Sequence, residues 1–119
     1  MNDDIYLLFG ASEKLNSKIV SLPRCLILVL LSYFVDGIQF RELKAALNMS
    51  DGKLISNLNG LRAMGYITKS EAEVDKRKLD VYSLTEKGRL ELNKVVEWMK
   101  LAQKVASGGD QECRMILTR

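Results

Sequence analysis

The chain has 119 residues, a length that suits one domain with a single hydrophobic core. Its hydrophobic fraction of 47% and charged fraction of 28% are those of a soluble globular protein, and a net charge of +3 permits nucleic acid as a partner without requiring it. Histidine is absent, which excludes Ser-His and Cys-His nucleophile pairs and removes the commonest zinc ligand. Two cysteines cannot complete a four-thiolate site, so we expect no enzyme, no cofactor and no metal.

The sequence shows no signal for secretion or membrane insertion. Asp3 and Asp4 give the N-terminus the wrong charge for a secretory signal. The most hydrophobic run, Cys25–Val35, is shorter than the roughly twenty residues that a spanning helix needs. We therefore expect a cytoplasmic protein that does not bind a membrane. Cys25 is interpreted as an inert buried thiol, and Cys113 as a thiol that would allow an intermolecular disulfide if it is exposed.

The first predicted helix covers residues 3–19, with one stripe formed by Ile5, Leu8, Phe9, Ser12, Leu15 and Ile19. Such a helix is either a packing brace or half of a dimer contact. Pro23 then begins a helix that is apolar on almost all sides through Val35, as expected for a helix buried on most sides. A turn at Asp36-Gly37, a short strand at 38–40 and a short helix at 41–47 follow.

Residues 50–64 form the most informative segment. Apolar residues recur at helical spacing, Ser50 is placed to cap the N-terminus, and Gly65 is placed for a left-handed C-terminal cap. The remaining side is small and polar, consisting of Gly52, Lys53, Ser56, Asn57, Asn59 and Gly60. An ordinary amphipathic surface helix would look similar. However, the short link to helix 41–47 matches a helix-turn-helix, whose second helix enters the DNA major groove.

The chain then changes from helical to alternating periodicity. Residues 66–74 and 79–84 are rich in β-formers and flank the cationic tip at 75–78, which predicts a β-hairpin. We expect Leu79 and Val81 to share one face. Thr85 is the expected N-cap of the last long helix, and Gly88 in its first turn indicates a close approach of another backbone. The apolar seam of this helix contains Leu92, Val95, Val96, Met99, Ala102 and Ala106.

Taken together, these segments resemble a winged-helix DNA-binding domain of the MarR/ArsR type. The resemblance covers residues 38–92 and is carried by Phe40-Arg41-Glu42-Leu43, Met64-Gly65-Tyr66-Ile67, Asp75-Lys76-Arg77 and Leu84-Thr85-Glu86-Lys87-Gly88, with the helix from Ser50 between the first two. The small size is similar to that of winged-helix regulators of archaea and their viruses. The implied fold is α+β, mainly α. It comprises a helix-turn-helix with a two-stranded wing, flanked by N- and C-terminal dimerisation helices.

The predicted organisation is one domain over residues 1–119. It consists of an N-terminal helix (3–19), a winged-helix core (22–84), a C-terminal dimerisation helix (85–107) and a tail (108–119) without an assigned structure.

The resemblance implies a homodimer that binds double-stranded DNA and regulates transcription. Helix 50–64 would occupy the major groove, and the wing at 75–78 would lie at the minor groove or the phosphates. The implied DNA-binding residues are Ser50, Gly52, Lys53, Ser56, Asn57, Lys76, Arg77 and Lys78. The implied dimer-interface residues are Ile5, Leu8, Leu92, Val95, Met99 and Ala102. No segment indicates a small-molecule effector.

Two features depart from the family pattern. Asp51 would repel phosphate unless it caps the helix or accepts a hydrogen bond from a cytosine amine, and Gly60 weakens the recognition helix. A winged helix used as a protein-interaction module and a low-specificity architectural DNA-binding protein therefore remain as alternatives. The cationic wing argues against the first, because such a module does not need one.

Overall fold

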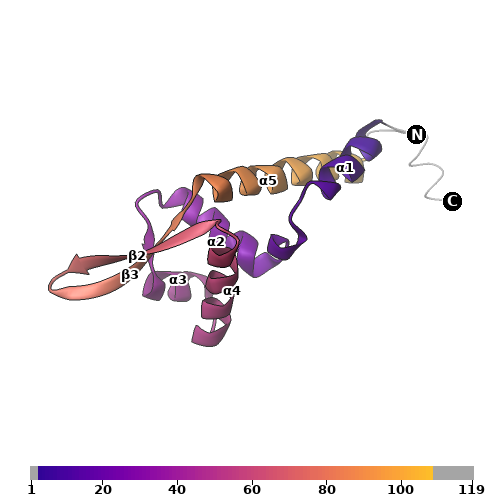
Figure 1. Ribbon diagram of the computed structural model, residues 1–119. Coiled ribbons are helices and arrows are strands. Elements are labelled where there is room, and N and C mark those ends of the chain that lie inside the picture. Colours follow the sequence, from indigo (N-terminus) through magenta and orange to yellow (C-terminus); the bar gives the residue numbers. More distant parts are fainter. Residues whose placement is uncertain (1–2, 109–119) are drawn as a thin grey trace. The chain divides into compact units, whose positions relative to one another are not determined.

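The computed structural model describes residues 3–108. The order of elements is α1 (Asp3–Glu13), a 3-10 helix η1 (Ser17–Ile19), α2 (Leu22–Tyr33), β1 (Ile38–Gln39), α3 (Phe40–Leu47), α4 (Asp51–Ala63), β2 (Ile67–Val74), β3 (Arg77–Leu84) and α5 (Glu86–Ala106) (Figure 1). This confirms the predicted α+β, mainly helical class. The chain forms two compact units. One covers residues 17–92, and the other pairs α1 with the part of α5 from Asn93 onward. The expectation of a single domain stays a prediction.

The unit of residues 17–92 combines a small antiparallel sheet with helices α2, α3 and α4. The strand order is β1-β3-β2, and β2 and β3 pair along their whole length, from Ile67 opposite Leu84 to Val74 opposite Arg77. The β2–β3 hairpin extends away from the helices (Figure 1). Eight aliphatic side chains are almost fully excluded from solvent and form the centre of the core: Ile19, Ile27, Leu28, Leu31, Leu43, Leu54, Leu58 and Leu61.

Two expectations about the first helices are wrong. The helix predicted over residues 3–19 ends at Glu13, where the amides of Lys14 and Leu15 donate to carbonyls three residues back and tighten the last turn. Ile19 belongs to η1 and lies fully buried. Helix α2 is also less buried than its composition suggested, since only Ile27, Leu28 and Leu31 are buried. A stripe of Leu22, Leu26, Val29 and Tyr33 is exposed.

Strand β3 carries Leu79 and Val81 on the same face, as expected from their alternation. Its most buried residue is Tyr82, with 6% of its surface exposed, whereas Val81 and Ser83 lie on the other face, next to Gly37. Gly37 has φ +95°, and a Cβ atom there would meet Val81 Cγ1 at 2.5 Å. Both faces of β3 are therefore in contact with other parts of the protein, because the turn before β1 approaches the face that carries Val81.

The C-terminus of α4 is joined to the N-terminus of α5 by a set of hydrogen bonds. Gly65 has φ +80° and donates to Arg62 O, while Tyr66 N donates to Leu61 O, which together form a Schellman cap. The Thr85 hydroxyl donates to Gly65 O at 2.7 Å and accepts from Gly88 N at 3.0 Å. The predicted caps at Gly65 and Thr85 are therefore confirmed.

The expected close approach at Gly88 is also confirmed. A Cβ atom at this position would collide with the carbonyl oxygen of Tyr66, which in turn accepts a hydrogen bond from Thr85 N at 3.0 Å. The neighbour is backbone, so it cannot rotate away as a side chain would. Glycine is therefore required for α4 and α5 to meet in this way.

We predict that Gly88→Ala lowers the free energy of unfolding by about 2–3 kcal/mol, because the added methyl group overpacks a site bounded by backbone. Urea unfolding followed by circular dichroism measures the change. Gly52→Ala is the matched control, since no atom lies within 4 Å of the position of its Cβ. This control is expected to be neutral or slightly stabilising. Equal stability of Gly88→Ala and the wild type would contradict the proposed packing.

Candidate nucleic-acid interface

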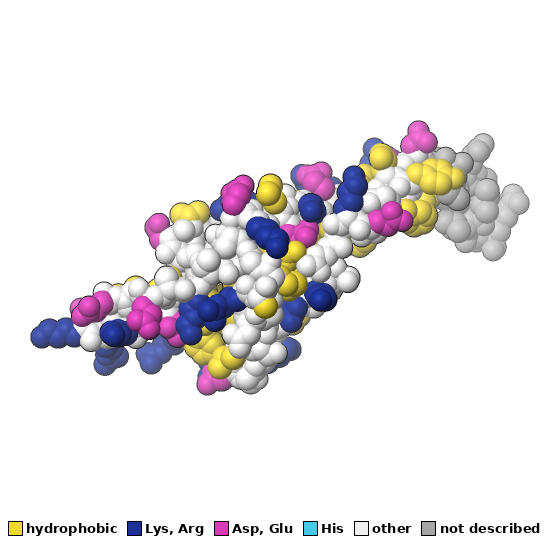
Figure 2. All heavy atoms as spheres, viewed as in Figure 1, with side chains coloured by type: hydrophobic (Ala, Val, Ile, Leu, Met, Phe, Trp, Pro, Cys, Tyr) yellow, Lys and Arg dark blue, Asp and Glu magenta, His cyan; other side chains and the backbone are white. Residues whose placement is uncertain are grey.

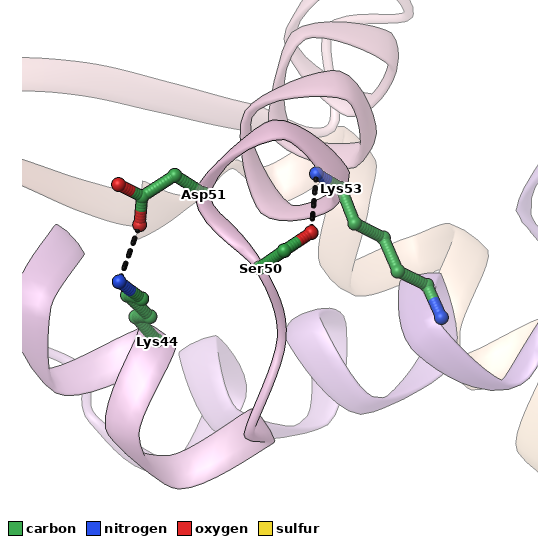
Figure 3. Close-up of polar contacts among 4 residues, drawn as sticks. All are labelled: Lys44, Ser50, Asp51 and Lys53. Atoms are coloured by element: carbon green, nitrogen blue, oxygen red, sulfur yellow. Dashed lines mark hydrogen bonds and ion pairs between the residues drawn. The ribbon is translucent and has the colours of Figure 1, made fainter.

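Helices α3 and α4 form the predicted helix-turn-helix. Helix α3 ends in Asn48, which adopts a left-handed conformation (φ 51°) that asparagine tolerates better than most residues. Ser50 then caps α4, because its Oγ accepts a hydrogen bond from Lys53 N at 3.3 Å (Figure 3). The link between the two helices is thus short and has a defined conformation.

Helix α4 buries one side and leaves the other exposed. Leu54, Leu58 and Leu61 have at most 1% of their surface exposed. On the opposite side Gly52, Lys53, Ser56 and Asn59 are exposed, and Asn57 and Gly60 are half-buried. Ile55, an apolar residue next to Leu54 in the same helix, is 45% exposed. An exposed surface with small and hydrogen-bonding side chains can approach base edges and phosphates closely.

The negative charge of Asp51 is balanced within the protein. Asp51 Oδ1 lies 2.7 Å from Lys44 Nζ of α3, and the Lys53 side chain extends from another side of α4 (Figure 3). Both partners of the pair are exposed, so it contributes little to stability. Its consequence is electrostatic, because an approaching phosphate meets an ion pair in place of a lone carboxylate. Sequence reasoning had not identified Lys44 as this partner.

The wing is a tighter hairpin than predicted. Only Asp75 and Lys76 form the turn, and both have positive φ, as a two-residue type I′ turn requires. Arg77 and Lys78 belong to β3, where successive side chains point to opposite faces. Lys76, Arg77 and Lys78 are all exposed, and Lys and Arg side chains gather along the hairpin in Figure 2.

A hollow connects the wing to the start of α3. Its lining includes Gln39 and Arg41 on one side and Arg77 and Lys78 on the other. Arg41 was not among the predicted DNA-binding residues, although it is a cation at the start of the helix-turn-helix. Its place in the same hollow as Arg77 depends on the pairing of β1 with β3, which the sequence pattern did not indicate.

Arg24 is a second residue that the sequence analysis missed. It lies at the start of α2, and its Nε donates to Asn57 Oδ1 at 3.1 Å. Its Nη1 donates to Lys18 O at 2.7 Å. Asn57, predicted to bind DNA, therefore contacts another helix of the same unit. No local signal could have revealed this contact, because 33 residues separate the two partners.

The predicted dimer-interface residues differ in exposure. Leu92 and Val95 are buried by the chain itself, Ile5, Leu8 and Ala102 are half-buried, and Met99 is 58% exposed. In the unit that contains α1, Trp98 Nε1 donates to Ser12 Oγ at 2.6 Å, and Lys104 pairs with Asp4 at 3.3 Å. Helix α1 therefore braces α5 within one chain. Tyr6, Leu7 and Phe9 remain exposed on α1.

Cys25 is half-buried, and its Sγ donates to Ile19 O at 3.4 Å. Burial raises the pKa of this thiol above its ordinary value, and a hydrogen bond with the Ser21 backbone opposes part of that rise. The reactive thiolate is thus disfavoured at neutral pH, which supports an inert thiol at this position. Cys113 lies outside the described residues.

Between residues 3 and 108, no helix has the length and apolarity needed to cross a membrane. The same part of the chain has no group of three or more His, Cys, Asp or Glu side chains arranged to hold a metal ion.

The family model described as "Winged helix DNA-binding domain" matches residues 24–102, two thirds of the chain. The chain belongs to the winged helix DNA-binding domain family. This is a family of DNA-binding proteins, which confirms the predicted class of function and the expectation of a protein that is not an enzyme. A comparison with curated proteins finds no match.

Several solved structures share this winged-helix fold. YusO from Bacillus subtilis is 16% identical, with a TM-score of 0.69, over 98% of this chain and 79% of that chain. A transcriptional regulator homologue from Pyrococcus horikoshii is 19% identical, with a TM-score of 0.64, over 92% and 99% of the two chains. A MarR-family regulator from Rhodococcus is 18% identical, with a TM-score of 0.64, over 95% and 79%. An archaeal or archaeal-virus source stays a prediction.

Proposed function

We propose that this winged-helix protein is a transcription regulator that binds double-stranded DNA as a homodimer. The observation that carries the proposal is helix α4, which is capped at both ends, buries its leucines completely and exposes a small polar surface in the same unit as a hairpin whose tip at residues 75–78 is cationic. Within a family of DNA-binding domains, this arrangement presents α4 to the major groove and the wing to the adjacent backbone. We place the protein in the cytoplasm.

The predicted contacts divide into two groups. Lys53 and Ser56 are exposed on the side of α4 that would face the bases, with Ser50 and Gly52 close to the DNA backbone. Asn57, predicted to face DNA with them, is half-buried and donates to and accepts from groups of the protein itself. Arg77 would enter the minor groove, and Lys76 and Lys78 would bind phosphates on either side of the hairpin. Arg41 would add a further phosphate contact, since it lines the same hollow as Arg77, together with Asp75 and Asp80.

Low-specificity architectural binding is the second candidate. It is favoured by the side-chain amide of Asn57, whose oxygen accepts from Arg24 and whose nitrogen donates to Lys53 O at 3.0 Å. An asparagine that recognises adenine needs both of these atoms. Comparing the protein's affinity for its own promoter with that for a scrambled duplex separates the two candidates, since equal affinity would favour the architectural role.

We propose that the dimer forms through α1 and α5, whose exposed apolar residues include Phe9 and Met99. Two copies of α4 would then reach successive major grooves about 34–36 Å apart. Sedimentation equilibrium at micromolar concentration is expected to give twice the 13.4 kDa mass of the chain. A mass of one chain would contradict the dimer while leaving DNA binding open.

We predict that Arg77→Ala weakens binding to the promoter duplex without unfolding the protein. The exposed side chain makes no core contact, and losing one cation from the interface lowers the slope of log affinity against log salt by about one unit per protomer. Gel shifts at two salt concentrations measure both effects, with Lys100→Gln on α5 as the control for loss of one charge elsewhere. An unchanged affinity of Arg77→Ala would remove the wing from the mechanism.

A further inference from the structure

Arg24 is held against the recognition helix by contacts at two points. Its Nε donates to Asn57 Oδ1 at 3.1 Å, and its Nη1 donates to Lys18 O at 2.7 Å. Two of the five N–H donors of the guanidinium are thereby engaged by neutral acceptors that do not cancel its charge. The group is consequently fixed in position while it remains a cation.

Gly60 provides the space in which this guanidinium lies. A Cβ atom on Gly60 would come within 2.5 Å of Arg24 Nη2 and 3.0 Å of Arg24 Cζ. Glycine in the middle of α4 lowers the stability of the helix. The close position of Arg24 explains why a residue without a side chain is nevertheless present there. The Nη2 amino group therefore lies over the backbone of α4, next to the exposed polar side that carries Lys53 and Ser56.

Asn57 is better placed to orient Arg24 than to recognise a base. Its Oδ1 accepts from Arg24, and its Nδ2 donates to Lys53 O one turn earlier in the same helix. Both ends of the amide are thus used within the protein. Breaking these bonds to recognise adenine would leave the guanidinium without its anchor on α4.

We propose that Arg24 is a DNA-contacting residue that binds a backbone phosphate at the edge of the major groove, and that Asn57 is the positioning residue that orients it. The proposal rests on the proposed DNA-binding function and adds a contact from α2, outside the helix-turn-helix and the wing. Guanidinium groups bind phosphate through parallel N–H donors, and a guanidinium already fixed in place loses little side-chain entropy on binding.

The test measures the affinity of variants at Arg24, Gly60 and Asn57 for the promoter duplex by fluorescence anisotropy at several salt concentrations. Arg24→Gln is expected to lower affinity about tenfold, the effect of one charge-assisted hydrogen bond, and to reduce the salt slope by about 0.9 per protomer. Gly60→Ala retains the arginine but fills the space under it, so a similar loss is expected. Arg24→Lys is expected to restore the salt slope only in part, because lysine lacks the Nε bond to Asn57.

The Asn57→Ala variant distinguishes two roles of Asn57, which are orienting the Arg24 guanidinium and recognising a base. If Asn57 acts through Arg24, the single variants and the Arg24→Gln/Asn57→Ala double variant lose similar affinity, and the preference for promoter over scrambled duplex is unchanged. If Asn57 recognises a base, the two losses multiply and that preference falls, which would overturn its positioning role. Lys100→Gln serves as the control for a charge lost from α5.

Thermal unfolding by circular dichroism accompanies each measurement. If Arg24→Gln does not fold, Gly60→Ala and Asn57→Ala still test the proposal, because both retain the charge of Arg24. An affinity unchanged from that of the wild type in the folded variants, with normal DNA binding by the wild type, would overturn the role of Arg24 alone. A wild-type protein that binds no duplex would overturn the proposed function and this inference together.

Discussion

The close contact between Gly88 and the Tyr66 carbonyl fixes where the recognition helix ends and the next strand begins. Around it, the Thr85 hydroxyl bridges Gly65 O and Gly88 N, and Lys87 Nζ donates to Met64 O at 2.9 Å. The carbonyls of Met64 and Gly65, which directly follow α4, thus accept hydrogen bonds from the start of α5. Because β2 and β3 connect these two ends, the same contacts also anchor the base of the wing.

Because these contacts hold the C-terminal end of α4, the helix can leave one of its sides without packing contacts. The three leucines of the helix supply its contact with the core, and the caps at Ser50 and Gly65 satisfy its ends, so the outward side need not contribute to stability. That side can therefore carry glycine, serine and lysine, which suit close approach to a duplex. The Lys44–Asp51 ion pair and the Arg24–Asn57 hydrogen bond set the charge distribution around it.

The sequence predicted those features that depend on local chemistry. The Ser50, Gly65 and Thr85 caps, the hairpin and the need for glycine at position 88 all follow from residue types at fixed spacings. Contacts between distant segments were not predictable in this way, as the Arg24–Asn57 bond shows. The exposed stripe on α2 was missed for a related reason. The residue pattern shows which sides of a helix are apolar, but it does not show which of those sides are covered by other elements. The assigned DNA-binding and dimer residues stay predictions.

We propose that the polar side of α4 and the wing together form the DNA-binding surface. Titrating ¹⁵N-labelled protein with the promoter duplex and following amide chemical shifts by NMR tests this claim directly. We expect the largest shifts at Gly52, Lys53 and Ser56 and at residues 75–78, with small shifts along the exposed stripe of α2. Shifts confined to that stripe or to α1, with α4 and the wing unperturbed, would contradict it.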